Sequence, residues 1–257
     1  MPASKFVWYE LMTGDPAAAQ RFYDAVMGWT SRDAGMGPDM PYTLAAVGTS
    51  DVAGLMGYPP GAKDMGIPPH WTGYVGVDDV DAMAARVLEA GGKVLHPPSD
   101  IPNVGRFAVV ADPQGADFAI FKGSGEPAPV PASGTPGTFG WNELVTSDWE
   151  KAFEFYSTLF GWTKDTAVDM GPMGTYQLFA IDGVGCGGMM NRPAEMPGGP
   201  AWQYYVNVSE IESAAGRIKA GGGTITHGPA QVPGGSWIVN AIDPQGAVFC
   251  AVAPAKA

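Results

Sequence analysis

The stretch FVWYELMTGDPAAAQRFYDAVMGWT (6–30) decides the fold, because a close copy, FGWNELVTSDWEKAFEFYSTLFGWT, recurs at 139–163. Two further stretches recur in the same order. WTGYVGVDDVDAMAARVLEAGGKVLH (71–96) matches WQYYVNVSEIESAAGRIKAGGGTITH (202–227), and ADPQGADF (111–118) matches IDPQGAVF (242–249). The first pair is offset by 133 residues (8 to 141) and the later pairs by 131 (71 to 202). A collinear repeat of this extent indicates an internal duplication with a small deletion in a loop.

Each half begins with a predicted strand, at 6–13 or 139–146, followed by a helix. Asp15 supplies an N-cap with a proline behind it, and Asp148 is the matching cap. A Gly-Trp pair at 28–29 or 161–162 ends the helix, as a C-terminal glycine should. Short strands are expected around Tyr42–Val47 and Tyr176–Ile181.

The second part of each half repeats this plan. A strand at 71–77 leads to a helix whose apolar residues at 80, 83, 84, 87 and 88 form one stripe. Two strands then flank Asp-Pro-Gln-Gly at 112–115 or 243–246, which suits a type I turn. The order strand, helix, then two or three strands occurs four times. We therefore expect an α+β fold of four βαβββ modules with largely antiparallel sheets.

A segment rich in proline, glycine and serine separates the halves and has the composition of a linker. We expect a first domain at 1–123, the linker at 124–137 and a second domain at 138–257.

Composition excludes several classes of partner. Acidic residues outnumber basic ones by 26 to 14, the net charge is −12, and no cluster of Lys and Arg is present. Nucleic acid and membranes are therefore not expected as partners. The chain has two cysteines and no apolar segment that resembles a signal peptide. We expect a cytoplasmic protein, monomeric or homodimeric, with a small-molecule ligand.

The doubled motifs resemble the glyoxalase/bleomycin-resistance (vicinal oxygen chelate) superfamily, and more narrowly its two-domain glyoxalase-like or hydroxylase-like subgroup. The resemblance covers nearly the whole chain outside the linker. It rests on a D…A..FY…G signature, a glycine helix stop and the D-P-x-G turn near each half's end. The signature residues are Asp15, Phe22, Tyr23 and Gly28 in the first half and Asp148, Phe155, Tyr156 and Gly161 in the second. The resemblance implies that paired modules form curved sheets, each a cup that holds a small ligand.

Metal-using members of that family place His, Gln and Glu ligands on the cup. In this sequence the two first-strand positions are Trp8 and Trp141, and the two last-strand positions are Ala119 and Cys250. The second-strand positions are Thr72 and Gln203, and the remaining ones fall in Gly-Leu-Met at 54–56 and Gly-Met-Met at 188–190. His70, His96 and His227 lie elsewhere and are expected to be structural or exposed. We therefore expect neither the family metal nor another cofactor.

Side chains on a strand alternate between faces. If the first-strand tryptophans face the cup, the cup carries these ligand-binding candidates: Trp8, Met12, Thr72, Tyr74, Trp141, Gln203 and Tyr205. Glu10 and Glu143 face it too and are the catalytic candidates, because a carboxylate in an apolar cup is suited to act as a general base or acid. The alternative is that each glutamate is hydrogen-bonded to a neighbouring Tyr, Trp or backbone N–H and fixes the sheet.

These residues leave three functions open. The first is metal-independent isomerase, lyase or accessory oxygenase-type chemistry on a small aromatic or polyketide-like molecule. The second is non-catalytic sequestration of a hydrophobic drug or metabolite, as in the bleomycin-resistance branch. The third, metal-dependent lactoylglutathione lyase or extradiol dioxygenase activity, is disfavoured because the metal ligands are missing.

Overall fold

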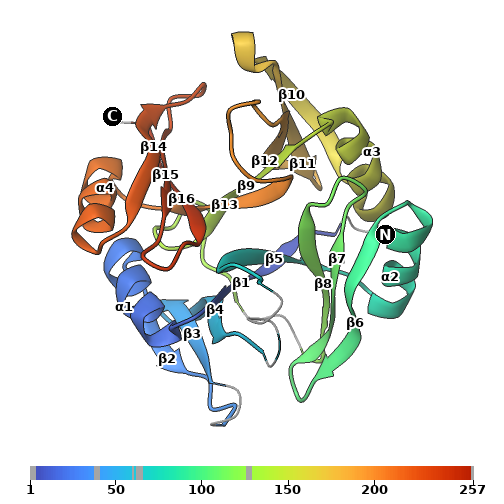
Figure 1. Cartoon of the computed structure of the whole chain (residues 1–257), viewed down its shortest axis with the longest axis horizontal. Helices are drawn as coiled ribbons and strands as arrows, with labels where there is room; N and C mark the ends of the chain where they lie inside the picture. Colours follow the sequence, from blue (N-terminus) through green and yellow to red (C-terminus); the bar gives the residue numbers. More distant parts are fainter. Residues whose placement is uncertain (1–3, 38–40, 60, 62–65, 126–128, 256–257) are drawn as a thin grey trace. The chain divides into compact units, whose positions relative to one another are not determined.

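A computed structural model describes residues 4–37, 41–59, 61, 66–125 and 129–255. Each half is built from two βαβββ modules, as the repeat predicts (Figure 1). The elements of the first half are β1 (Phe6–Thr13), α1 (Pro16–Met27), β2 (Thr30–Asp33), β3 (Tyr42–Val47), β4 (Ser50–Gly57), β5 (His70–Gly76), α2 (Val80–Glu89), β6 (Lys93–Ile101), β7 (Gly105–Ala111) and β8 (Asp117–Gly123). Those of the second half are β9 (Phe139–Thr146), α3 (Trp149–Phe160), β10 (Thr163–Asp169), a 3₁₀ turn (Gly171–Met173), β11 (Thr175–Ile181), β12 (Val184–Asn191), β13 (Ala201–Asn207), α4 (Ile211–Ala220), β14 (Thr224–Gln231), β15 (Trp237–Ile242) and β16 (Val248–Ala253).

The strands form two open eight-stranded sheets with the same topology. The orders are β2-β3-β4-β1-β5-β8-β7-β6 and β10-β11-β12-β9-β13-β16-β15-β14. Consecutive strands after each helix pair antiparallel, whereas the first and last strands of a module pair parallel, as β1 does with β4. The helical crossover returns the chain in the direction of the first strand, and two hairpins then bring the last strand beside it. The predicted α+β class is confirmed.

Local sequence signals start and stop the first helix of each half. The Asp15 carboxylate accepts from the backbone N–H of Ala18, and Pro16 opens α1. Gly28 ends α1 with φ of 76°, in the left-handed region where a side chain would be strained. Asp148 and Gly161 do the same for α3.

Helix α2 buries a narrower stripe than the sequence pattern suggests. Val80, Met83, Ala84 and Val87 are buried, but Leu88 is 55% exposed. The apolar stripe predicted from the sequence therefore includes one residue too many. Leu88 lies about 100° around the helix from Val87 and points away from the buried face.

The described chain divides into two compact units, and each unit takes one module from each half. Unit 1 comprises residues 1–7, 73–127 and 141–203, and unit 2 comprises residues 8–72, 128–140 and 204–257. Within unit 2, α1 packs beside α4, and within unit 1, α2 packs beside α3 (Figure 1). The end of the segment between the halves packs in unit 2, where the Gly137 carbonyl accepts from the Trp29 indole at 2.7 Å.

The same buried contact joins the two halves inside each unit. In unit 2 the Tyr23 hydroxyl donates to Asp243 at 3.0 Å and accepts from the Trp71 indole at 3.0 Å. In unit 1 Tyr156 donates to Asp112 at 3.3 Å and accepts from Trp202 at 3.0 Å. The family-signature tyrosine of one half therefore binds the turn aspartate of the other half.

The glutamine of each Asp-Pro-Gln-Gly turn also reaches across to the other half. Gln245 accepts from the Asp15 N–H at 2.7 Å and donates to the Asp15 carbonyl at 2.9 Å. Gln114 binds the N–H and the carbonyl of Asp148 in the same way, at 2.6 Å and 2.7 Å. Each turn thereby fixes the start of a helix that belongs to the other half.

Among the helices of the described residues, none combines the length and the apolarity that a membrane span requires.

Candidate functional site

The two faces of β1 have different surroundings. Leu11 and Thr13 are fully buried on one face, whereas Trp8, Glu10 and Met12 are half-buried on the other. Helix α1 packs against β3 and β4 of the same module, whose buried residues include Ala45 and Leu55. Because side chains alternate along a strand, Trp8, Glu10 and Met12 share the face that the helix does not cover, which we call the open face.

On the open face Trp8 and Glu10 are joined through a tyrosine of β3. The Trp8 indole N–H donates to the Tyr42 hydroxyl at 3.0 Å, and that hydroxyl donates to Glu10 Oε2 at 2.7 Å. Burial of the phenol, reinforced by the adjacent carboxylate, raises the pKa of Tyr42 far above its ordinary value. Tyr42 therefore stays protonated and donates to Glu10, forming an ordered Trp–Tyr–Glu network.

A glycine makes room for this network. Gly54 lies opposite Glu10 in the register of β4 with β1, and opposite Leu44 of β3. A Cβ atom at Gly54 would stand 1.8 Å from the Tyr42 hydroxyl oxygen. The Tyr42 ring consequently lies over the backbone of β4, where only glycine leaves space for it.

The modules are numbered 1 to 4 in chain order (β1 to β4, β5 to β8, β9 to β12 and β13 to β16). Module 3 repeats the network of module 1 residue for residue. The Trp141 indole donates to Tyr176 at 2.8 Å, and Tyr176 donates to Glu143 Oε2 at 2.9 Å. Gly188 pairs with Glu143, and a Cβ there would stand 2.3 Å from the Tyr176 ring. Because both copies keep the same three side chains and the same glycine, we treat these four residues as one conserved arrangement within the chain.

The remaining candidates lie on the first strands of modules 2 and 4. Thr72 and Tyr74 of β5, and Gln203 and Tyr205 of β13, are all buried, with 3% to 9% of their surface exposed. The Tyr205 hydroxyl accepts from the Asn240 amide at 3.3 Å. Tyr74 packs against two aromatic rings of its own module, those of Phe107 and Phe121.

The histidines have different surroundings. Nδ1 of His70 lies 2.8 Å from the carbonyl oxygen of Pro68, two residues earlier in the chain. His96 is exposed and stacks on Phe107, with ring centroids 5.1 Å apart and planes inclined by 13°. His227 is also exposed.

Three of the positions at which members of that family bind metal carry side chains without a ligating atom: Trp8, Trp141 and Ala119. Both indole nitrogens at the first-strand positions, Trp8 and Trp141, carry their protons in hydrogen bonds and have no lone pair to offer. Ala119 has no ligating atom, whereas Gln203 and Cys250 each have one. Across the part of the chain that the structure describes, no three His, Cys, Asp or Glu side chains cluster in a way that could hold a metal.

Sequence reasoning missed Tyr42 and Tyr176 as members of the site. It placed both on strands without assigning them a role. A signal was available, because Tyr42 and Gly54 of the first half recur as Tyr176 and Gly188 at one common offset (42 to 176, 54 to 188).

Comparison with known proteins finds two matches to one family model. The model of the Glyoxalase/Bleomycin resistance protein/Dioxygenase superfamily matches residues 5–120 and 138–251. The chain is 34% identical over 250 residues to "Putative glyoxylase CFP32" of Mycobacterium tuberculosis (strain CDC 1551 / Oshkosh), covering 96% of this chain and 94% of that protein. It is also 34% identical over 257 residues to "Anthracycline biosynthesis protein DnrV" of Streptomyces peucetius, covering 95% and 91%.

Solved structures share the fold at low identity. The Mn(II)-bound glyoxalase from Novosphingobium aromaticivorans superposes with a TM-score of 0.69 at 18% identity, covering 99% of this chain and 83% of that one. Homoprotocatechuate 2,3-dioxygenase from Brevibacterium fuscum, in its substrate complex, gives a TM-score of 0.67 at 16% identity, covering 99% and 82%.

Proposed function

The chain belongs to the glyoxalase/bleomycin resistance protein/dioxygenase superfamily, and from that membership we propose that it binds a small aromatic molecule against its Trp–Tyr–Glu networks without the family metal. The observation that carries this proposal is the exact recurrence of the network as Trp8–Tyr42–Glu10 and as Trp141–Tyr176–Glu143 on the half-buried face of each sheet.

The networks supply the two elements that small-molecule sites combine. Trp8 and Tyr42 present aromatic surface, and Glu10 presents an acceptor whose position is fixed by the Tyr42 hydroxyl. Mostly apolar surfaces with few, well-placed polar groups orient a ligand while excluding water.

The ligand class is supported by one of the relatives. The Streptomyces peucetius protein is named for anthracycline biosynthesis, and anthracyclines are flat, fused-ring aromatic molecules that carry hydroxyl groups. A hydroxylated aromatic ligand matches a surface of aromatic rings beside a carboxylate acceptor.

The absence of the family metal is part of the proposal. It is supported by the residues at the ligand positions, where two indoles and an alanine replace the expected donors. Elemental analysis of protein purified without added metal should find no stoichiometric transition metal. One equivalent of manganese, iron, nickel or zinc per half would contradict this part of the proposal.

Binding is tested by calorimetric titration with 1,4-dihydroxyanthraquinone. We expect saturable binding that is weakened at least about tenfold by Trp8→Ala together with Trp141→Ala, since each change removes an aromatic surface and one hydrogen bond. Wild-type affinity in that double variant, in protein that melts normally, would contradict the proposal.

Catalysis is the second candidate, and the contact between phenol and carboxylate favours it. A carboxylate held 2.7 Å from a protonated phenol is positioned for proton transfer to or from a bound molecule. Glu10→Gln combined with Glu143→Gln distinguishes the two functions. If the protein is an enzyme, turnover of its substrate collapses while the affinity survives; if it only binds, the wild type converts no bound ligand.

A further inference from the structure

Module 2 carries a row of four aromatic side chains on one face of its strands. The rings belong to β5, β6, β7 and β8, and we call this set the aromatic row: Tyr74, His96, Phe107 and Phe121. Tyr74 lies 6.2 Å from Phe121 and 6.5 Å from Phe107 between ring centroids, and His96 stacks on Phe107 at 5.1 Å.

The row lies on the face of the sheet that α2 does not cover. Val75, Val110 and Ile120 are fully buried on the other face, and α2 packs against β6, β7 and β8. Phe107 and Phe121 are direct cross-strand partners and are half-buried, while His96 is exposed. The row is therefore an aromatic surface open at the His96 end.

His96 is held in a defined orientation by its own strand. The Ser99 hydroxyl donates its single proton to the Pro97 carbonyl at 2.9 Å, so the 3.1 Å contact between His96 Nε2 and Ser99 Oγ has the imidazole N–H as donor. In this tautomer Nδ1 carries a lone pair and can accept a hydrogen bond.

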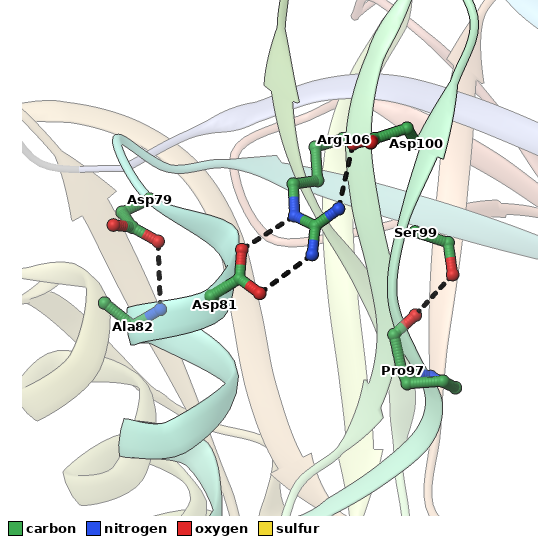
Figure 2. A network of polar contacts seen from close by, with 7 residues as sticks. All are labelled: Asp79, Asp81, Ala82, Pro97, Ser99, Asp100 and Arg106. Atoms are coloured by element: carbon green, nitrogen blue, oxygen red, sulfur yellow. Dashed lines mark hydrogen bonds and ion pairs between the residues drawn. The ribbon is translucent and has the colours of Figure 1, made fainter.

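Strand β6 is itself tied to its neighbours near His96. Arg106 of β7 donates to both carboxylate oxygens of Asp81 of α2, at 2.7 Å and 2.8 Å, and to Asp100 of β6 at 2.9 Å (Figure 2). The same view shows the Ser99 hydroxyl on the Pro97 carbonyl. Arg106 thus connects β6, the strand that carries His96, to β7 and α2.

The second half lacks this row. Its residues at the equivalent positions are Tyr205, His227, Ile238 and Val252, so both phenylalanines are replaced by aliphatic side chains. Ala230 stands where Ser99 would hold the histidine, and Asn240, in place of Val109, donates to Tyr205. The surface therefore carries four aromatic rings in module 2, but two rings, two aliphatic side chains and an amide in module 4.

We infer that the aromatic row of module 2 is the stacking surface for a flat, fused-ring ligand that carries a phenolic hydroxyl, and that module 4 does not stack such a ligand. This inference rests on the proposed function and assigns the stacking of the aromatic ligand to module 2. The parallel His96–Phe107 pair shows that a planar ring lies against this surface at stacking distance. A phenolic O–H of the ligand would donate to His96 Nδ1.

The test exchanges residues between the halves in the full chain. Phe107→Ile with Phe121→Val gives module 2 the residues of module 4, and 1,4-dihydroxyanthraquinone is the titrant. Two lost ring contacts should weaken binding roughly 5- to 150-fold. The matched control, Ile238→Val with Val252→Ala, shrinks the equivalent residues of module 4 and should bind as the wild type does.

A second variant tests the orientation of His96 without changing the rings. Ser99→Ala removes the acceptor that fixes the imidazole and introduces the residue of the second half. It should weaken binding of 1,4-dihydroxyanthraquinone about 3- to 10-fold, while anthraquinone, which lacks the hydroxyls, should bind equally well before and after the change.

The outcomes separate this inference from the proposed function. Saturable binding that survives the Phe107/Phe121 exchange, or that the module 4 control weakens as much, overturns the inference while the proposed function stands. No saturable binding to the wild type overturns both. If the variant with Phe107→Ile and Phe121→Val melts far below the wild type, the test rests on Ser99→Ala. Equal affinity of the wild type and Ser99→Ala for 1,4-dihydroxyanthraquinone would then overturn the inference.

Discussion

The phenol of Tyr23 on α1 donates a 3.0 Å hydrogen bond to Asp243, a residue 220 positions later in the chain. Its counterpart Tyr156 reaches back to Asp112 in the same way. The duplicated halves are therefore reciprocally joined through buried polar contacts, and the stability of each compact unit depends on residues from both halves.

Removing the Tyr23 hydroxyl should be costly. In Tyr23→Phe the Asp243 carboxylate and the Trp71 indole each lose a buried partner, so we expect the free energy of unfolding to fall by about 1–3 kcal/mol. Urea unfolding followed by circular dichroism measures it. Tyr58→Phe is the matched control, since no hydrogen bond of the Tyr58 hydroxyl occurs among the described residues, and an equal loss in both variants would contradict the assignment.

The two turn glutamines should differ in importance. Gln114 binds Thr146, Ser147 and both backbone groups of Asp148, whereas Gln245 binds the two backbone groups of Asp15. Gln114→Ala should therefore lower the melting temperature more than Gln245→Ala does. Differential scanning calorimetry of the two variants compares them, and the reverse order would show that these bonds do not set the cost.

Asp112 should make stability depend on pH. Burial raises the pKa of its carboxyl above the ordinary value, against the opposing effect of three backbone N–H donors and Tyr156. Between the ordinary and the raised pKa, the native state holds a proton that the unfolded chain has lost. The contribution of Asp112 to the free energy of unfolding therefore falls as the pH rises through that interval.

Asp112→Asn removes this titration. We expect the free energy of unfolding of the wild type, minus that of the variant, to be larger at pH 4 than at pH 8 when both are measured over this range. A difference that stays constant over this range would refute the expected linkage.

Gly54 should be as important to the site as the residues that it accommodates. A methyl group at Gly54 would displace the Tyr42 ring and break its bond to Glu10, so Gly54→Ala should weaken binding of 1,4-dihydroxyanthraquinone as much as Tyr42→Phe does. Gly57→Ala is the control on the same strand, because among the described residues a Cβ there would meet Pro16 alone, at 3.7 Å. Normal affinity in Gly54→Ala would show that Tyr42 does not need that space.

The sequence predicts the modules well because their signals are local. Asp15 and Gly28 delimit α1 through backbone groups a few residues away, and alternation along β1 places Trp8 and Glu10 on one face. Tyr42 joins them only because β4 lies between β1 and β3 in a register that no local pattern specifies.

The pairing of modules could not be predicted for a related reason. Tyr23 has two equivalent partners in the sequence, Asp112 and Asp243, since the duplication supplies the same turn twice. The choice depends on packing between distant segments, such as Phe22 against Phe249 with ring centroids 5.6 Å apart. A Cβ at Gly221 would stand 2.8 Å from Phe22, and the first half has Ala90 at that position.

The division into mixed units also constrains how the protein is made. A ribosome releases the chain from its N-terminus, so Phe22 and Tyr23 emerge long before the residues at 204–257 that complete their unit. During that interval β3 and β4 of the first module can cover α1, but Phe22 lacks Phe249 and the Tyr23 hydroxyl lacks Asp243. Unit 2 can therefore be completed only after residues 204–257 have been synthesised.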